Sequence, residues 1–85
     1  MKKLVEEVAG EGLENLLGER VTLMCSNYFY TGKLIGVNNT SVMLTDAAIV
    51  YETGSLLDKT WKDAQQLPND WYVQIAAVES FGILK

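Results

Sequence analysis

Residues 30–46 have the sequence Tyr-Thr-Gly-Lys-Leu-Ile-Gly-Val-Asn-Asn-Thr-Ser-Val-Met-Leu-Thr-Asp. Apolar residues alternate on both sides of a short polar segment, which predicts two antiparallel strands joined by a tight hairpin turn. Tyr30, Gly32, Leu34 and Gly36 share one face of the first strand, because side chains alternate between the two faces of a sheet. With two glycines on that face, we expect the strand to bend sharply and the sheet to curl into a small barrel.

One more strand is predicted before the hairpin, so the two hairpin strands are the second and third strands of the chain. In residues 20–26, Val21, Leu23 and Cys25 alternate with other residues, which indicates a half-buried strand. After the turn, the third strand is expected to place Val42, Leu44 and Asp46 on one face and Ser41, Met43 and Thr45 on the other, and to extend through Tyr51. We expect these strands to form the centre of the fold.

The C-terminal block predicts a further pair of strands. Residues 70–84 are rich in apolar and aromatic side chains and carry one charge, Glu79, after the opening Asp70. Two short strands with a tight step at Ala76-Ala77 fit this pattern. An edge with so little charge invites pairing with another strand, which favours an oligomer.

The segments outside these strands have weaker patterns. A helix is predicted at the N-terminus and Gly18 is expected to end it, because apolar residues recur there at spacings of three and four: Leu4, Val5, Val8, Leu13, Leu16 and Leu17. Residues 54–69 form an excursion between strands. Ser55 and Asp58 suit a capping box, so this excursion is expected to be either a short helical turn or a loop.

The 85 residues are expected to fold as one domain, 1–85. It divides into a helix (1–18), three strands (19–52), the variable excursion (53–69) and two strands (70–85). The formal net charge is −4, which argues against a general nucleic-acid binder, although residues 21–50 hold only one acid and one base. The single cysteine, Cys25, and an N-terminus without a signal-peptide pattern favour a cytoplasmic protein off the membrane.

The composition offers little catalytic chemistry. The chain has no histidine, which removes the usual acid–base partner of a serine or cysteine nucleophile and the commonest metal ligand. One cysteine cannot assemble a zinc site. Gly32 and Gly36 lie inside a predicted strand and do not form a phosphate-binding loop. We therefore expect no enzymatic activity, no metal and no cofactor.

The pattern G-x-L-x-G followed by V-x-L-x-D resembles the first signature of the Sm and Sm-like family. Gly32, Leu34, Gly36, Val42, Leu44 and Asp46 match it. The C-terminal pattern Ile75-x-x-Val78 is similar to that of bacterial Sm-like and Hfq-like barrels. The resemblance implies a mainly β fold, in which an N-terminal α-helix precedes five strongly bent antiparallel strands that form a small barrel. It also implies a closed homo-oligomeric ring that binds single-stranded RNA around its pore.

The resemblance places RNA contacts in the turn between the second and third strands, and the candidate RNA-binding residues are Asn38, Asn39, Thr40 and Ser41. Asn38 stands where the family has an Asp and Ser41 where it has an Asn, while Asn39 or Thr40 occupies the place of a base-stacking side chain. Ala76-Ala77 replaces the family's Arg-Gly step. The same four residues would also make a good hairpin turn without any ligand.

The resemblance also suggests which residues join neighbouring subunits, through pairing of the fourth strand of one copy with the fifth of the next. The candidate interface residues are Trp71, Tyr72, Val73, Ile75, Phe81 and Ile83. Two functions stay open: an RNA-associated ring, or a ring-shaped protein-interaction or assembly module that does not bind RNA and uses the excursion. Neither DNA nor a membrane is an expected partner.

Overall fold

The structure, a computed structural model, describes residues 12–57 and 60–84. These residues form a mainly β fold with a six-stranded antiparallel sheet. The strands are β1 (Arg20–Cys25), β2 (Phe29–Val37), β3 (Ser41–Glu52), β4 (Asp63–Gln66), β5 (Trp71–Gln74) and β6 (Val78–Gly82). Two short 3-10 helices, η1 (Gly12–Leu16) and η2 (Ile75–Ala77), complete the described part.

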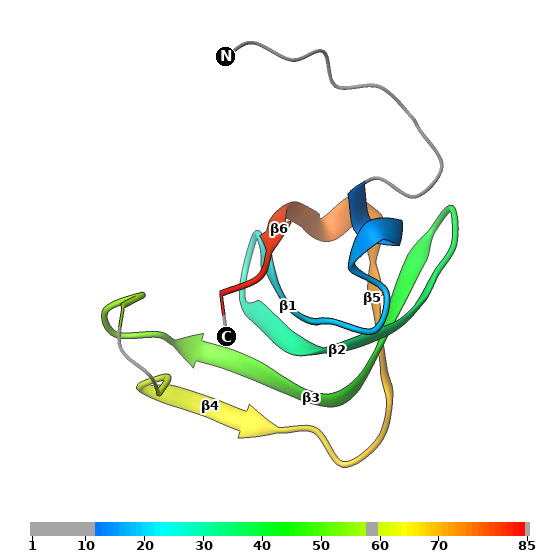
Figure 1. The fold of residues 1–85 in the computed structure, drawn as a ribbon. Helices are drawn as coiled ribbons and strands as arrows, with labels where there is room; N and C mark the ends of the chain where they lie inside the picture. Colours follow the sequence, from blue (N-terminus) through cyan, green and yellow to red (C-terminus); the bar gives the residue numbers. More distant parts are fainter. Residues whose placement is uncertain (1–11, 58–59, 85) are drawn as a thin grey trace, which may run out of the picture.

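The sheet has the order β4-β3-β2-β1-β6, and β5 pairs with β3 beyond the stretch that β4 occupies. The chain passes from β5 to β6 through the three residues of η2, although these strands pair with opposite sides of the β1–β2–β3 meander. So short a link is possible only because the sheet is strongly bent, and Figure 1 shows the strands curving around a common interior.

The core fills this interior with apolar side chains from four strands. Its buried residues are Val21, Leu23, Leu34, Val42, Leu44, Ala47 and Val73. Leu13 and Leu16 of η1 pack against them from one side. The alternating pattern of the sequence had predicted the burial of Val21 and Leu23 in β1 and of Val42 and Leu44 in β3, because alternate side chains face the same side of a strand. It did not predict that Thr22 is buried as well and that Cys25 is only half-buried.

β3 carries one extra residue opposite Gly32. The two residues that flank Gly32 in β2 pair with Thr45 and Ala48, which lie three positions apart in β3, so the register shifts there. Asp46 stands in this bulge with a φ of 50° and is exposed. The expectation that Asp46 shares a face with Val42 and Leu44, which are buried, is therefore wrong, because a β-bulge interrupts the strict alternation of side chains.

The two glycines of β2 differ in how closely the neighbouring strand approaches them. A Cβ placed on Gly32 would lie 3.1 Å from both the Ala47 Cα and the Thr45 carbonyl oxygen. A Cβ on Gly36 would meet only the Met43 Cβ, at 3.4 Å, which is an ordinary contact. The close passage of β3 across β2 thus favours glycine at position 32, where a side chain would push the neighbouring strand away, and leaves ordinary space at position 36.

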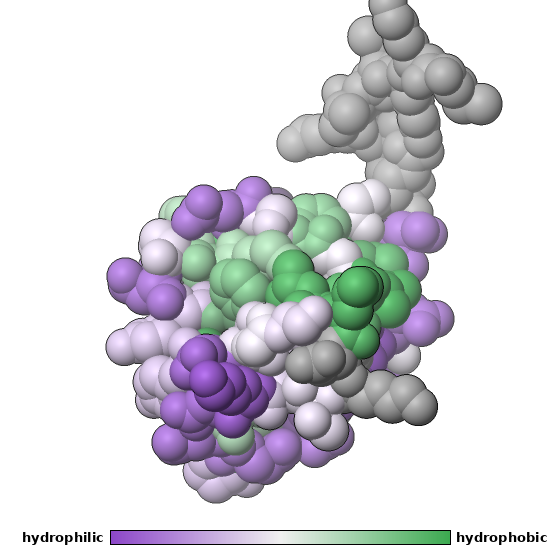
Figure 2. All heavy atoms as spheres, turned by 90° about the vertical axis from the view of Figure 1, so that its left-hand side faces the viewer, coloured by the Kyte–Doolittle hydropathy of each residue, from purple (hydrophilic) through white to green (hydrophobic). Residues whose placement is uncertain are grey.

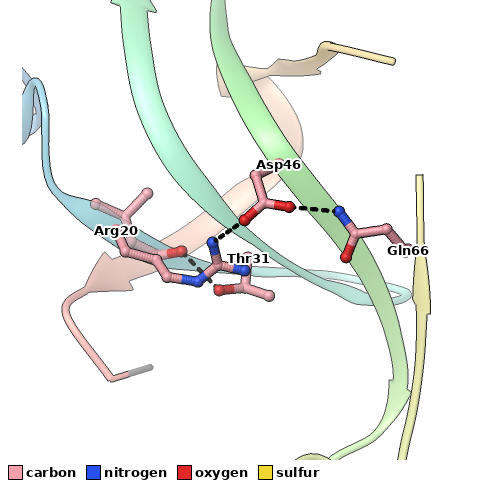
Figure 3. A network of polar contacts seen from close by, with 5 residues as sticks. Arg20, Thr31, Asp46 and Gln66 are labelled. Atoms are coloured by element: carbon pink, nitrogen blue, oxygen red, sulfur yellow. Dashed lines mark hydrogen bonds and ion pairs between the residues drawn. The ribbon is translucent and has the colours of Figure 1, made fainter. Parts of the chain in front are cut away.

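A polar network connects β1, β3 and β4 on the outside of the bulge (Figure 3). Arg20 donates from its guanidinium to Asp46 Oδ2 at 3.1 Å, and Gln66 Nε2 donates to Asp46 Oδ1 at 2.8 Å. Nearby, the buried Thr31 hydroxyl donates to the Val21 carbonyl oxygen at 3.1 Å, so this buried polar group has a hydrogen-bond partner. Both side chains of the Arg20–Asp46 pair are substantially exposed, so its contribution to stability is small.

The predicted N-terminal helix lies largely outside the described residues, which begin at position 12. The part that is described, Gly12–Leu16, is a single 3-10 turn instead of an α-helix. Gly18 follows it with a φ of 88°, a conformation that favours glycine at a helix end. Its amide donates to the Leu34 carbonyl at 2.8 Å, and the Leu34 amide donates to the Glu19 carbonyl at 2.9 Å, so this segment is fixed to β2.

The excursion between β3 and β5 contains a strand that the sequence did not predict. β4 pairs with residues 48–52 of β3, and all four of its residues are exposed. Of the two alternatives expected for the excursion, the described residues 53–57 and 60–62 form a loop and contain no helical turn. Asp58, of the suggested capping box, lies outside the described residues. β3 extends beyond the stretch that pairs with β5. The backbone amides and carbonyls of this extension are therefore available to pair with β4. The described sheet therefore has six strands and not the expected five.

The C-terminal prediction is confirmed. Two short strands, β5 and β6, flank a tight step at η2, which contains both Ala76 and Ala77. β6 pairs antiparallel with β1, from Thr22 opposite Gly82 to Cys25 opposite Val78.

Candidate functional site

The turn between β2 and β3 is held together by the Asn38 side chain. Asn38 Oδ1 accepts hydrogen bonds from the backbone amides of Thr40 and Ser41, both at 2.8 Å. The hydroxyls of Thr40 and Ser41 also approach this oxygen, at 3.2 and 3.4 Å. Asparagine commonly stabilises turns in this way. Asn38 therefore shapes the turn, and its carboxamide oxygen is already used by the protein.

The turn is also fixed to the C-terminal strand pair. The Ile75 amide at the start of η2 donates to the Thr40 carbonyl oxygen at 2.9 Å. Ser41 lies directly opposite Gln74 in the β3–β5 ladder. These contacts bring residues more than 30 positions apart in the sequence to one end of the sheet.

A hollow of about 680 Å³ lies between the turn and the β5–η2 step. It is lined by Asn39, Thr40, Ser41, Tyr72, Gln74, Ile75 and Ala76. Three of the four candidate RNA-binding residues thus line one concave surface, whereas Asn38 does not. Ala76, at the position where the resemblance places an arginine, lines it as well.

Two lining residues belong to β5 and were not predicted to lie with the turn. Tyr72 was predicted as an interface residue, and Gln74 was not singled out. Their placement follows from the register, in which Ser41 opposes Gln74 and Met43 opposes Tyr72, so that all four side chains belong to one face. The sequence predicted a strand in this region but not its pairing with the turn end of β3.

None of the residues that line the hollow is charged. Amide, hydroxyl and phenol groups can donate and accept hydrogen bonds, and the tyrosine ring offers an aromatic face. The lining has no carboxylate, thiol or amine for acid–base or nucleophilic chemistry. The lining of the hollow thus offers hydrogen-bonding groups and one aromatic face without any charged group.

The described groups with shifted pKa values lie elsewhere. Burial raises the pKa of the Cys25 thiol, and the negative charge of Glu79 raises it further. Burial also raises the pKa of Tyr30, with smaller contributions from Cys25 and the neighbouring tyrosines 28 and 51. Neither Cys25 nor Tyr30 lines the hollow. Their raised pKa values reflect burial near the turn between β1 and β2, away from the candidate site.

No metal centre or membrane span is found in the described residues. Within 12–57 and 60–84, no group of three or more His, Cys, Asp or Glu residues is placed to hold a metal ion. The same part of the chain has no helix long and apolar enough to cross a bilayer.

The predicted interface residues fall into two groups. Trp71, Tyr72, Phe81 and Ile83 are exposed, whereas Val73 is buried in the core and Ile75 is half-buried against it. Figure 2 shows apolar atoms in a band across one face of the molecule, with polar atoms predominating below it, toward the level of β4 in Figure 1. Exposed side chains are available to a partner, but Val73 is not.

Comparisons of the chain with protein-family models, curated proteins and solved structures found no match.

Proposed function

We propose that this chain is a subunit of a homo-oligomeric Sm-like ring that binds single-stranded RNA beside residues 38–41. The hollow between this turn and the β5–η2 step carries the proposal. It contains the turn residues Asn39, Thr40 and Ser41 together with Ala76, which are the positions where the sequence resemblance implies RNA contacts. The strongly bent antiparallel sheet and the Gly32 to Asp46 signature also support an Sm-like fold for this subunit.

The ring is supported by two free strand edges. Within the described residues, β5 pairs only with β3, and β6 pairs only with β1. Each strand therefore leaves a row of backbone donors and acceptors unpaired, beside exposed Trp71 on β5 and Phe81 on β6. Pairing of β5 in one copy with β6 in the next would satisfy both rows. Such a contact joins two different surfaces, and it generates a ring when the rotation from one copy to the next closes.

Light scattering coupled to gel filtration tests the assembly. A ring requires a mass that is a multiple of the 9.4 kDa chain and is independent of dilution over a broad range. A stable monomer of 9.4 kDa would contradict it. Replacing Phe81 with lysine at the exposed edge should reduce the mass, while Gln65→Lys on β4 serves as a matched control for added charge.

RNA binding is tested with labelled U-rich and A-rich oligonucleotides over a series of salt concentrations. Saturable binding is expected, and it should weaken in Asn39→Ala and in Ser41→Ala, whose side chains line the hollow. Gln65→Ala on the exposed strand β4 is the control. Absence of binding at low salt, where phosphate contacts are strongest, would overturn the RNA function.

A protein-interaction or assembly ring is the second candidate. It is favoured by the net charge of −4 and by Leu57 in the excursion, an apolar side chain that is 94% exposed. The same binding series separates the two candidate functions. A stable oligomer that does not bind RNA at any salt concentration supports the interaction module.

A further inference from the structure

The hollow beside the turn contains an aromatic ring that does not come from the turn. Tyr72 of β5 is 64% exposed, whereas Trp71 and Phe81 are 40% and 44% exposed. Neither Asn39 nor Thr40 has a ring, so the turn itself offers no stacking surface. Tyr72 is the aromatic residue among those that line the hollow.

The β3–β5 register places hydrogen-bonding groups next to this ring. Tyr72 and Gln74 lie two positions apart on one face of β5, which corresponds to roughly 7 Å along a strand. Ser41 lies opposite Gln74 on the same face, at the distance of a cross-strand pair. Val73, between Tyr72 and Gln74, points into the core and fixes the strand in this orientation. A flat ring above Tyr72 would thus have the carboxamide of Gln74 and the hydroxyl of Ser41 at its edge. The Ser41 oxygen can accept a hydrogen bond there while its proton is directed toward Asn38 Oδ1.

The lack of charge indicates which part of a nucleotide the hollow suits. Phosphate binding relies on Lys and Arg, and none lines the hollow. A nucleobase is neutral, has an aromatic face and carries donors and acceptors on its edge, which a carboxamide can pair in two positions. Stacking on an aromatic side chain holds bases of single strands whatever their sequence, because every base has a π-face.

We propose that Tyr72 is the base-stacking residue of the site and that Gln74 and Ser41 hydrogen-bond the edge of the stacked base. This assignment rests on the proposed RNA function and identifies the bound moiety as an unpaired base of single-stranded RNA. The stacking group thus comes from β5, across the sheet from the turn.

The test compares Tyr72→Ala, Tyr72→Phe and the control Tyr51→Ala by fluorescence anisotropy with labelled single-stranded RNA. Tyr51 is also an exposed tyrosine, but it lies at the other end of β3. Tyr72→Ala should weaken binding about tenfold or more, Tyr72→Phe by less than about threefold, and Tyr51→Ala not measurably. The slope of log K against log salt should stay unchanged in Tyr72→Ala, because no phosphate contact is removed.

Abasic oligonucleotides provide the second measurement. They retain every phosphate but lack bases, so the difference between wild type and Tyr72→Ala should disappear with them. Equal binding of wild type and Tyr72→Ala to ordinary RNA overturns the stacking assignment alone, whereas no binding by wild type overturns the RNA function and this assignment together. A Tyr72→Ala chain that folds but loses its oligomeric mass assigns the residue to a subunit interface and also overturns the proposal.

Discussion

β5 and β4 both pair with β3 and both are four residues long, yet they relate to the core in opposite ways. β5 covers residues 41–44 and buries Val73, whereas β4 covers residues 48–52 and buries none of its side chains. Backbone pairing alone therefore does not make a strand part of the core. β5 is held by hydrogen bonds and apolar packing, and β4 by hydrogen bonds and polar contacts at the surface.

The largest effect is expected at the bulge that separates these two stretches of β3. Gly32→Ala would force a methyl group to within 3.1 Å of the Ala47 and Thr45 backbone, and should lower the free energy of unfolding by about 3 kcal/mol. Gly36→Ala is the matched control and should change it by less than about 1 kcal/mol, since its methyl would meet only the Met43 side chain. Urea denaturation measures both. Equal losses would show that the close passage at Gly32 does not determine the bend.

A smaller effect is expected from truncating the side chain that joins β5 to the core. Val73→Ala removes the equivalent of two buried methylene groups and should lower the free energy of unfolding by about 2 kcal/mol. Gln65→Ala at an exposed position of β4 should stay within about 0.5 kcal/mol of wild type. Chemical denaturation of the two variants tests the comparison, and similar losses in both would refute it.

The smallest effect concerns the polar contact that fixes β4. Gln66→Ala removes the hydrogen bond to Asp46 and should lower global stability by only about 0.5 kcal/mol, because the group is exposed. Amide hydrogen exchange should nevertheless become faster in β4 and stay unchanged in β5. Faster exchange in both strands would show that they open as one unit.

The sequence predicted the strands whose apolar side chains form the core or pack against it, and missed β4, whose four residues are all exposed. Trp-Tyr-Val-Gln in β5 carries an apolar alternation, whereas Asp-Ala-Gln-Gln in β4 has no such signal. The sequence also failed to predict that Asp46 lies in a β-bulge and is exposed, because the alternation of residues 41–45 is the same with or without an extra residue after it. Strand pairing depends on backbone groups that every residue has, so β4 became visible only with the three-dimensional arrangement.

The candidate site was predicted in part for a related reason. The turn residues 38–41 stand out by their polarity between two apolar alternations. Tyr72 and Gln74 join them only through the β3–β5 register, which pairs Met43 with Tyr72 and Ser41 with Gln74. Asn38 was grouped with the candidate ligands, although its side-chain oxygen holds the turn.

The connection from β3 to β4 makes the chain a suitable carrier for inserted sequence. A backbone hydrogen bond of 3.2 Å from the Lys62 amide to the Thr53 carbonyl oxygen and an ion pair of 3.2 Å between Lys62 and Glu52 close its base. Lengthening a flexible loop costs only about 0.6 kcal/mol for each doubling of its length. A peptide tag placed between Thr53 and Lys62 would thus emerge from a closed stem, away from the residues that line the hollow.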